Sequence, residues 1–412
     1  TEDDRMREWL EARAASEEMQ GVAIGMLSHN RRILRPMDDS VMKVVKGRQQ
    51  FIRRARGYVP SPIPVDITGE SYSAGGDLKS SFCFIKNGLA YVSQYLGDME
   101  SVSCQHFYNN ERNAMISIFG FNPESSAVDK HPGYFSKGSG VTFSESRGIK
   151  CKEIQHHEAH VASVIAEHHL QGRVLGFAFD GTGYGDDGSI WGGETFLWDG
   201  QSMTRVAHLN TMRLIGGDEG AKNCDTILEG MLHGNDIAPR EITMESQLIR
   251  AALDKNINTV RSSSMGRLFD AVSALLDICH YNSYEGQAPI ELENVAAGTT
   301  DSYPLHIGAG GDTRQLFEDI VYAISNGVDK ASLARGFIYA VADYIVDVAK
   351  SYESQLDDGR QVVLSGGTFL NRILLERAIT SLEAMGFSVY TAEALPPGDG
   401  GICLGQAFLS QF

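Results

Sequence analysis

The sequence predicts an α/β protein built from two similar halves. Its 412 residues are 42% hydrophobic and include 44 glycines, as in an ordinary globular protein of two or three domains. Two strand–turn–strand segments, Leu78–Tyr95 and Arg173–Asp199, resemble each other in layout, which indicates a duplicated architecture with a cleft between its halves. Near the end, two strand–loop–helix units follow in series, from Gln361 and from Phe387.

Composition and charge narrow the class of protein. A net charge of −17 argues against a general nucleic-acid-binding surface, because neutralising phosphates needs clustered Lys and Arg. No apolar run reaches the roughly 18 residues of a membrane helix. The polar start, Thr1–Arg5, has no signal-peptide core, so we expect a cytoplasmic protein without membrane or nucleic-acid partners. The six cysteines form no Cys-x-x-Cys pair, and each reads as a small buried side chain.

The first 66 residues predict a small separate unit. Residues 5–20 carry a helical charge pattern, and Gly21–Leu27 reads as a short strand. The dense basic stretch Arg53–Arg56 fits either a solvated helix end or a phosphate-contacting loop between domains. Residues 57–66 hold three prolines, which is typical of a linker, so we place a domain boundary near residue 60.

Each later element has its own local signal. Leu78–Ile85 and Leu89–Tyr95 are predicted strands joined by a turn at Lys86-Asn87-Gly88, because Asn-Gly tolerates the positive φ of a tight hairpin. Arg173–Asp180 and Ile190–Trp198 form the corresponding pair. Helical periodicity predicts helices over 266–276 and 331–352, and the final units end in helices from about Asn371 and over 402–409.

His156 and His160 are the first candidate metal ligands. Four residues apart on a helix, their imidazoles leave the same face, although such a pair also occurs by chance on surface helices. The pair does not form the metalloprotease motif His-Glu-x-x-His, so carboxylates must come from elsewhere. Asp180 and Asp399, in Gly-flanked loops after strands, are the best candidates. His157 would point about 100° away, as a residue behind the ligands or on the surface.

Glycine loops and one lysine are candidates for binding phosphate. Gly181-Thr182-Gly183, Gly366-Gly367 and the loop 398–401 each follow a predicted strand, where backbone N–H groups approach an anion. None fits the Walker A or Rossmann pattern, and each taken alone is also consistent with a plain tight turn. Lys79 fits either a phosphate-neutralising residue or a solvent-facing lysine on an edge strand.

Taken together, these motifs resemble the hydrogenase-maturation carbamoyltransferase (HypF) family. They occur in the family's order from about residue 20 to the end. The motifs are Gln155–His160, Phe179–Gly185, Trp191–Glu194, Gly266–Val272, Tyr284–Gln287, Ser365–Asn371 and Pro397–Gly401, with Asp77–Lys79, Ser93-Gln94 and Gly97-Asp98. Two segments depart from the pattern. Glu158 stands where many relatives carry a third histidine, and Gly216–Asn223 begins like the family's Gly-Gly-Asp stretch before diverging.

The resemblance implies an actin-like ATPase (ASKHA) fold and a domain plan. Residues 61–170 and 171–412 would be the two halves around a nucleotide cleft. Residues 1–60 would be the end of a YrdC-like carbamoyl-adenylating domain plus linker, so we expect a fragment of a longer enzyme. It would use carbamoyl adenylate but would not start from carbamoyl phosphate.

The resemblance also implies a reaction and a set of site residues. The carbamoyl group of carbamoyl adenylate, made from ATP and carbamoyl phosphate, would pass to the C-terminal cysteine of the partner protein HypE, for the cyanide ligands of nickel–iron hydrogenase. His156, His160, Asp180 and Asp399 would hold iron or zinc, Lys79 and His157 would be catalytic, and Mg²⁺ would accompany ATP. The nucleotide would lie against Gly181, Thr182, Gly183, Gly217, Asp218, Gly266, Arg267, Asp270, Gly366, Gly367 and Asn371.

Two other functions fit the same sequence. One is an O-carbamoyltransferase that acts on a small-molecule hydroxyl, since such enzymes can carry the same domains. The other is a non-catalytic actin-like nucleotide-binding module, which would have no need for two histidines and two aspartates placed as metal ligands.

Overall fold

The computed structural model describes residues 35–239 and 241–412 and contains two large sheets. The predicted helix at 5–20 and strand at 21–27 lie outside these residues. The first sheet has the strand order β3-β6-β5-β4-β7-β8. Its strands are β3 (Ile63–Pro64), β4 (Ser71–Ser73), β5 (Cys83–Lys86), β6 (Leu89–Val92), β7 (Ser125–Asp129) and β8 (Lys150–Ile154).

The second sheet repeats this plan. Its core order is β11-β10-β9-β14-β15, and β12 and β13 extend it beyond β10. The strands are β9 (Val174–Tyr184), β10 (Ile190–Trp198), β11 (Met203–His208), β12 (Met212–Ile215), β13 (Thr259–Ser262), β14 (Gln361–Ser365) and β15 (Ser388–Thr391). The corresponding strands of the first sheet are β6-β5-β4-β7-β8. In both runs of five strands, the first three pair antiparallel and the last two join in parallel. The predicted duplication is therefore confirmed.

The strands that correspond between the halves differ from our prediction. By their place in the strand order, β9 and β10 match β4 and β5. The sequence had instead predicted that the hairpin now seen as β9 and β10 corresponds to β5 and β6. The prediction contained no strand at β4, whose three residues are Ser71, Tyr72 and Ser73. In the hairpin that follows, Asn87 and Gly88 have φ of 54° and 72° and make the expected tight turn, but β5 begins only at Cys83. Residues 78 and 79 form a turn instead, with Lys79 at φ 46° and its N–H bonded to Asp98 Oδ1 at 2.7 Å.

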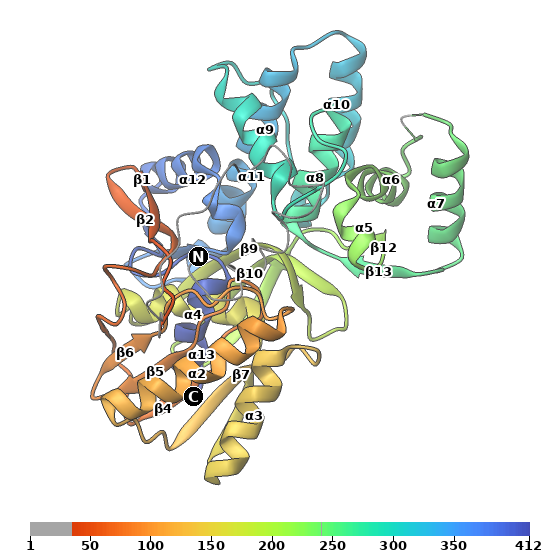
Figure 1. Ribbon diagram of the computed structural model, residues 1–412. Coiled ribbons are helices and arrows are strands. Elements are labelled where there is room, and N and C mark those ends of the chain that lie inside the picture. The colour runs from red at the N-terminus through yellow and green to blue at the C-terminus, as the bar shows by residue number, and fades with distance from the viewer. Residues whose placement is uncertain (1–34, 240) are drawn as a thin grey trace, which may run out of the picture.

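Two helices cross between the sheets, as Figure 1 shows. α4 (His156–Glu167) follows the first sheet but packs on β9, β10 and β14 of the second, and α13 (Ile402–Leu409) packs on β4, β5 and β7 of the first. α4 and α13 also pack on each other. Gly405 permits this closeness, because a Cβ there would lie 1.9 Å from Ala159 O.

The remaining helices cover the sheets. α2 (Val102–Phe119) and α3 (Phe135–Arg147) belong to the first half, where an aromatic core includes Tyr72, Phe84 and Tyr108. The second half adds α5 (Asp218–Lys222), α6 (Cys224–Gly234), α7 (Met244–Asp254), α8 (Met265–Leu275), α9 (Gln287–Ala297), α10 (Arg314–Ser325), α11 (Lys330–Tyr352) and α12 (Arg372–Ala384). Short 3₁₀ turns are η2 (Ala309–Gly311), η3 (Glu353–Gln355), η4 (Gly367–Leu370) and η5 (Asp399–Gly401). The predicted helices at 266–276, 331–352, from Asn371 and at 402–409 are confirmed.

A two-stranded hairpin, β1 (Val41–Val45) and β2 (Arg48–Arg53), precedes both sheets. The predicted solvated helix end at Arg53–Arg56 is wrong, because Arg53 ends a strand and Arg54 is buried, donating to the carbonyls of Tyr58 and Ser61. The proline-rich segment after it is not all linker, since Ile63 and Pro64 form the edge strand β3. Within the described residues, no helix has the length and apolarity needed to cross a membrane. All six cysteines are free thiols, and Cys151 alone of them is exposed.

Candidate metal and nucleotide site

Four predicted ligands meet where α4 and α13 begin. His156 and His160 lie in the first turns of α4, whose N-cap is Gln155, and Asp399 opens η5 just before α13. Asp180 comes from β9, which runs on through Tyr184, so the predicted loop at Gly181–Gly183 is in fact strand. The packing of α4 against α13 thus brings together candidate ligands that are far apart in sequence.

The ligand atoms fit one small cation. The Nε2 atom of His160 lies 3.3 Å from Asp180 Oδ2 and 3.7 Å from Asp399 Oδ1, and the corresponding distances from His156 Nε2 are 3.8 and 3.7 Å. All four ligand atoms lie within 4.8 Å of one another. A tetrahedron of ligands at 2.0–2.2 Å from a zinc ion has edges of roughly 3.3–3.6 Å, so the spacing is close to that needed.

The hydrogen bonds of His156 and His160 use the Nδ1 atom of each ring and leave each Nε2 atom free to bind a metal. His156 Nδ1 lies 2.8 Å from Asp129 Oδ2, and His160 Nδ1 lies 3.2 Å from Pro397 O. Both partners accept, so each Nδ1 carries the proton and each Nε2 offers a lone pair. Both Nε2 atoms are buried and have no hydrogen-bond partner. A buried polar atom without a partner is costly, and a bound metal would satisfy both.

The charges of the site agree with a cation between anions. Although burial opposes it, the carboxylates of Asp129 and Asp399 raise the pKa of His156 well above its usual value. Burial also disfavours an ionised Asp180, but the neighbouring imidazoles of His156 and His160 hold its pKa well below the ordinary range. The carboxylates around His156 therefore favour a positive charge at this position, as a bound metal would supply.

His157 is fully buried, so the surface position considered for it is wrong. Its Nδ1 lies 3.4 Å from Gln155 Nε2, and its Nε2 has no partner. Burial and the neighbouring His156 and His160 lower the pKa of His157 well below its usual value. Gly183 packs against it, since a Cβ there would lie 2.4 Å from His157 Cε1.

Several predicted nucleotide residues gather beside the metal ligands. Gly266, in the first turn of α8, packs against Gly181, because a Cβ on Gly266 would lie 2.7 Å from Gly181 Cα. Ser264 caps α8 and donates its hydroxyl to Gly181 O at 2.6 Å. Gly367 N donates to Asp180 Oδ1 at 3.2 Å. Backbone of β9, the start of α8 and η4 thus adjoin the ligand Asp180.

The other predicted nucleotide residues occupy more varied positions. Arg267 and Asp270 form an ion pair at 2.9 Å, and Arg267 also donates to Ala221 O of α5, the helix that Gly217 caps. Asn371 caps α12, and its buried Nδ2 has no partner. Thr182 is exposed. Asp218 is the first residue of α5, and its side chain lies outside the described part of the structure.

Lys79 reaches across from the first half to the second. Its Nζ lies 2.7 Å from both carboxylate oxygens of Glu285, in the loop before α9. Burial opposes the charge, but Glu285, Asp399 and Asp180 together raise the pKa of Lys79. Lys79 therefore favours its charged form, in the electrostatic field of the candidate metal ligands Asp180 and Asp399.

Sequence reasoning missed the residues that support these ligands. Asp129 is the last residue of β7, whose sequence Ser-Ser-Ala-Val-Asp has little apolar character to indicate a strand. Glu194 lay in a quoted motif but had no assigned role. It is fully buried and binds Arg205 Nε and Ser263 Oγ, both at 2.5 Å, beside the cap of α8.

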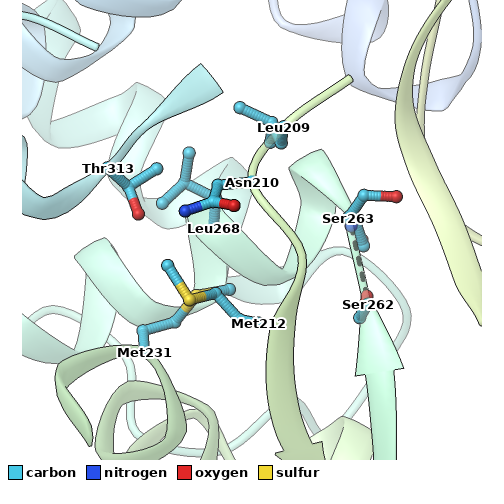
Figure 2. A pocket seen from close by; sticks show the side chains of 9 residues that line it. Leu209, Asn210, Met212, Met231, Ser262, Ser263, Leu268 and Thr313 are labelled. Atoms are coloured by element: carbon cyan, nitrogen blue, oxygen red, sulfur yellow. Dashed lines mark hydrogen bonds between the residues drawn. The ribbon is translucent and has the colours of Figure 1, made fainter. Parts of the chain in front are cut away.

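A separate small pocket adjoins the start of α8. Figure 2 shows Leu209, Asn210, Met212, Met231, Leu268 and Thr313 around it, with Ser262 and Ser263 on one side. Its volume, about 10 Å³, is enough for one water molecule. None of the four candidate metal ligands lines it, so it is distinct from the candidate metal site.

Comparison with known proteins identifies the class of protein to which the chain belongs. The chain carries a Kae1-like carbamoyltransferase domain. The family models for the HypF Kae1-like domain and for the second subdomain of the carbamoyltransferase Kae1-like domain match residues 68–167 and 176–406. The chain belongs to the HypF carbamoyltransferase family.

Individual relatives agree with this assignment. The carbamoyltransferase HypF of Synechocystis sp. is 33% identical over 94% of this chain and 53% of its own length. A full-length HypF, crystallised in a phosphate- and nucleotide-bound form, superposes with a TM-score of 0.87 at 34% identity, covering 98% of this chain and 64% of that one. A shorter HypF homolog of Cupriavidus necator is 29% identical over 82% of this chain and 90% of its own length. The chain spans about half the length of the first of these relatives.

Proposed function

We propose that this chain is the part of a HypF enzyme that transfers a carbamoyl group from carbamoyl adenylate to the C-terminal cysteine of HypE. The observation that carries the proposal is the pair of buried, unpartnered Nε2 atoms on His156 and His160, which face Asp180 and Asp399. Beside them lie backbone N–H groups and a helix N-terminus, the usual binding site of a nucleotide phosphate. The product would supply cyanide ligands of nickel–iron hydrogenase.

In the proposed reaction, the thiol sulfur of the acceptor bonds to the carbamoyl carbon. The bond between that carbon and the phosphate oxygen breaks, AMP leaves with the bonding electrons, and the thiol proton passes to a base or to water. An iron or zinc ion held by His156, His160, Asp180 and Asp399 would polarise the carbamoyl oxygen. Lys79 and the start of α8 would stabilise the phosphate charge of the leaving AMP. His157, buried and neutral, would accept a proton or orient the carbamoyl group.

The domain plan and cofactors belong to the same proposal. Residues 1–60 would end an adenylating domain, and 61–170 and 171–412 would form the two halves, with α13 of the latter lying against the first sheet. ATP with Mg²⁺ and carbamoyl phosphate would be substrates of the longer enzyme. The cytoplasm is the compartment we propose.

The test supplies carbamoyl adenylate to the purified, metal-loaded chain with either HypE or a sugar alcohol. We expect HypE to gain the mass of one carbamoyl group at its C-terminal cysteine, and the sugar alcohol to remain unchanged. His160→Ala should abolish transfer and bound metal. His168→Ala, which removes a histidine at the other end of α4, should preserve both. Carbamoylation of the alcohol alone would favour the O-carbamoyltransferase, and no transfer to either would favour the non-catalytic module.

A further inference from the structure

The β1–β2 hairpin is docked on the second half, although it precedes the first half in sequence. Figure 1 shows it beside α12. Val45 is buried in the main core of the second half, and Arg48 and Gln49 donate to the carbonyls of Val389 and Glu393 at 3.2 and 3.1 Å. At its end, the hairpin joins the first half, where Tyr95 N donates to Arg54 O at 3.3 Å. The hairpin therefore spans both halves.

Two side chains of the hairpin hold the end of η4. Gln50 Nε2 donates to Phe369 O at 3.2 Å, and Lys43 Nζ donates to Leu370 O. The turn's own bonds run from Phe369 N to Gly366 O and from Asn371 N to Thr368 O, so they use neither of these carbonyls. Gln50 is only 3% exposed. The hairpin thus supplies donors that these carbonyls need.

The same segment is held from its other side by the metal site. Gly366 N donates to Pro397 O at 2.8 Å, and Gly367 N donates to the ligand Asp180. Between these attachments, Phe369 is fully buried and stacks on Phe179 with ring centroids 5.4 Å apart. The glycine-containing segment Gly366–Asn371 is therefore fixed between the metal ligands and the hairpin.

We infer that Gln50 and Lys43 are positioning residues for nucleotide binding. They hold Gly366–Asn371 in the conformation that receives the nucleotide, without touching the nucleotide themselves. A segment with two adjacent glycines loses much conformational entropy when a ligand orders it, so ordering it beforehand strengthens binding. The inference rests on the proposed function, in which this segment contacts the nucleotide.

The hairpin offers a matched control. Lys46 lies on the same hairpin but binds side chains of α12, with its Nζ 3.0 Å from Thr380 Oγ1 and 3.3 Å from Glu383 Oε2. Lys43→Met and Lys46→Met therefore remove the same charge from the same element, and only the first frees a carbonyl of η4. Gln50→Leu removes the second contact with little change of volume.

The experiment measures AMP binding to the full chain by calorimetry, together with bound metal and hydrogen exchange of the Gly366–Asn371 amides. We expect Lys43→Met and Gln50→Leu to bind AMP about tenfold more weakly and to exchange faster in this segment, with unchanged metal content. Lys46→Met should match the unmodified chain. Equal affinity in all three variants, or equal loss in Lys46→Met, would overturn this inference alone. Absence of AMP binding by the unmodified chain would instead overturn the proposed function.

Discussion

At the scale of single residues, the site depends on which nitrogen of each histidine is already bonded. Asp129 and the carbonyl of Pro397 take the Nδ1 protons, which leaves both Nε2 atoms facing Asp180 and Asp399. The carboxylate of Asp129 also increases the electron-donating power of the His156 ring. Metal affinity should therefore depend on a residue that is not a ligand.

We predict that Asp129→Asn lowers metal affinity by about tenfold while the fold remains intact. The amide cannot take the His156 proton and the His131 N–H with the same two oxygens that Asp129 uses. Competition with a chelator measures the affinity, and circular dichroism reports the fold. Asp77→Asn is the control, because Asp77 accepts two backbone N–H groups at the start of α3 and contacts no ligand. Equal loss in both variants would contradict the prediction.

We expect two glycines of the Phe179–Gly185 motif to respond differently to replacement by alanine. A Cβ on Gly183 would lie 2.4 Å from His157 and 3.0 Å from His156, whereas one on Gly181 meets nothing closer than Arg267 at 3.9 Å. We predict that Gly183→Ala costs about 1–3 kcal/mol of stability and loses metal, because the histidines must shift. Gly181→Ala should retain metal and stability. Urea unfolding and metal analysis measure the two losses. A greater loss in Gly181→Ala than in Gly183→Ala would refute the packing argument.

Sequence predicted the ligands better than their supports. His156 and His160 were accessible because helical spacing places them on one face, and Asp180 and Asp399 because each stands in a Gly-flanked segment after a predicted strand. Asp129 was not accessible, since it reaches His156 only after β7 and α4 come together in the fold. Contacts between distant segments leave no periodic signal in one sequence.

At the scale of elements, β10 secures the start of α8 through Trp191–Glu194. Gly192 and Gly193 allow the backbones of Asp180 and Ser263 to approach, since Cβ atoms there would lie 2.6 and 2.5 Å from the carbonyl oxygens of those two residues. Glu194 then binds Ser263, next to the α8 cap Ser264, while its partner Arg205 lies over the Trp191 ring at 4.1 Å. This motif connects the second sheet to both Asp180, a candidate metal ligand, and α8, the helix predicted to bind the nucleotide.

We predict that Glu194→Gln destabilises the chain by about 3 kcal/mol, because it leaves Arg205 without its buried counter-charge. In this variant an amide nitrogen also replaces a carboxylate oxygen of Glu194 that accepts a hydrogen bond. Urea unfolding measures the loss. The control, Glu376→Gln, removes an exposed partner of Arg372 on α12 and should leave the unfolding midpoint unchanged. A similar midpoint in both variants would show that the buried pair contributes little.

Sequence signals placed most elements correctly and erred where strands contain polar or glycine-rich residues. The segment Gly181–Gly183 looked like a loop, but β9 continues through it, and Gly183 and Tyr184 pair with β10. Conversely, Leu78–Phe82 looked like a strand, but Asp98 fixes a turn at Lys79. In both cases tertiary hydrogen bonds overrode the local preference.

At the scale of the whole molecule, the two halves share a strand order and exchange their final helices. Because α4 and α13 each pack on the other half's sheet, the candidate metal ligands lie where the halves meet. Two ion pairs also join the halves: Lys79 with Glu285, and Lys130 with Asp186 at 2.8 Å. Only the first involves a residue proposed to contact the phosphate, so the two pairs can be told apart by experiment.

We predict that Glu285→Gln strengthens AMP binding roughly threefold at low salt, because Lys79 no longer has to leave a carboxylate to reach the phosphate. Both partners are partly exposed, so the gain should shrink as salt screens the charges. Lys79→Met should weaken binding and make the Glu285→Gln change ineffective in the double variant. Asp186→Asn, which breaks the other ion pair, should leave AMP affinity unaltered. If Asp186→Asn strengthens binding as much as Glu285→Gln does, then the pairs act by holding the halves together, and competition for Lys79 is not the cause.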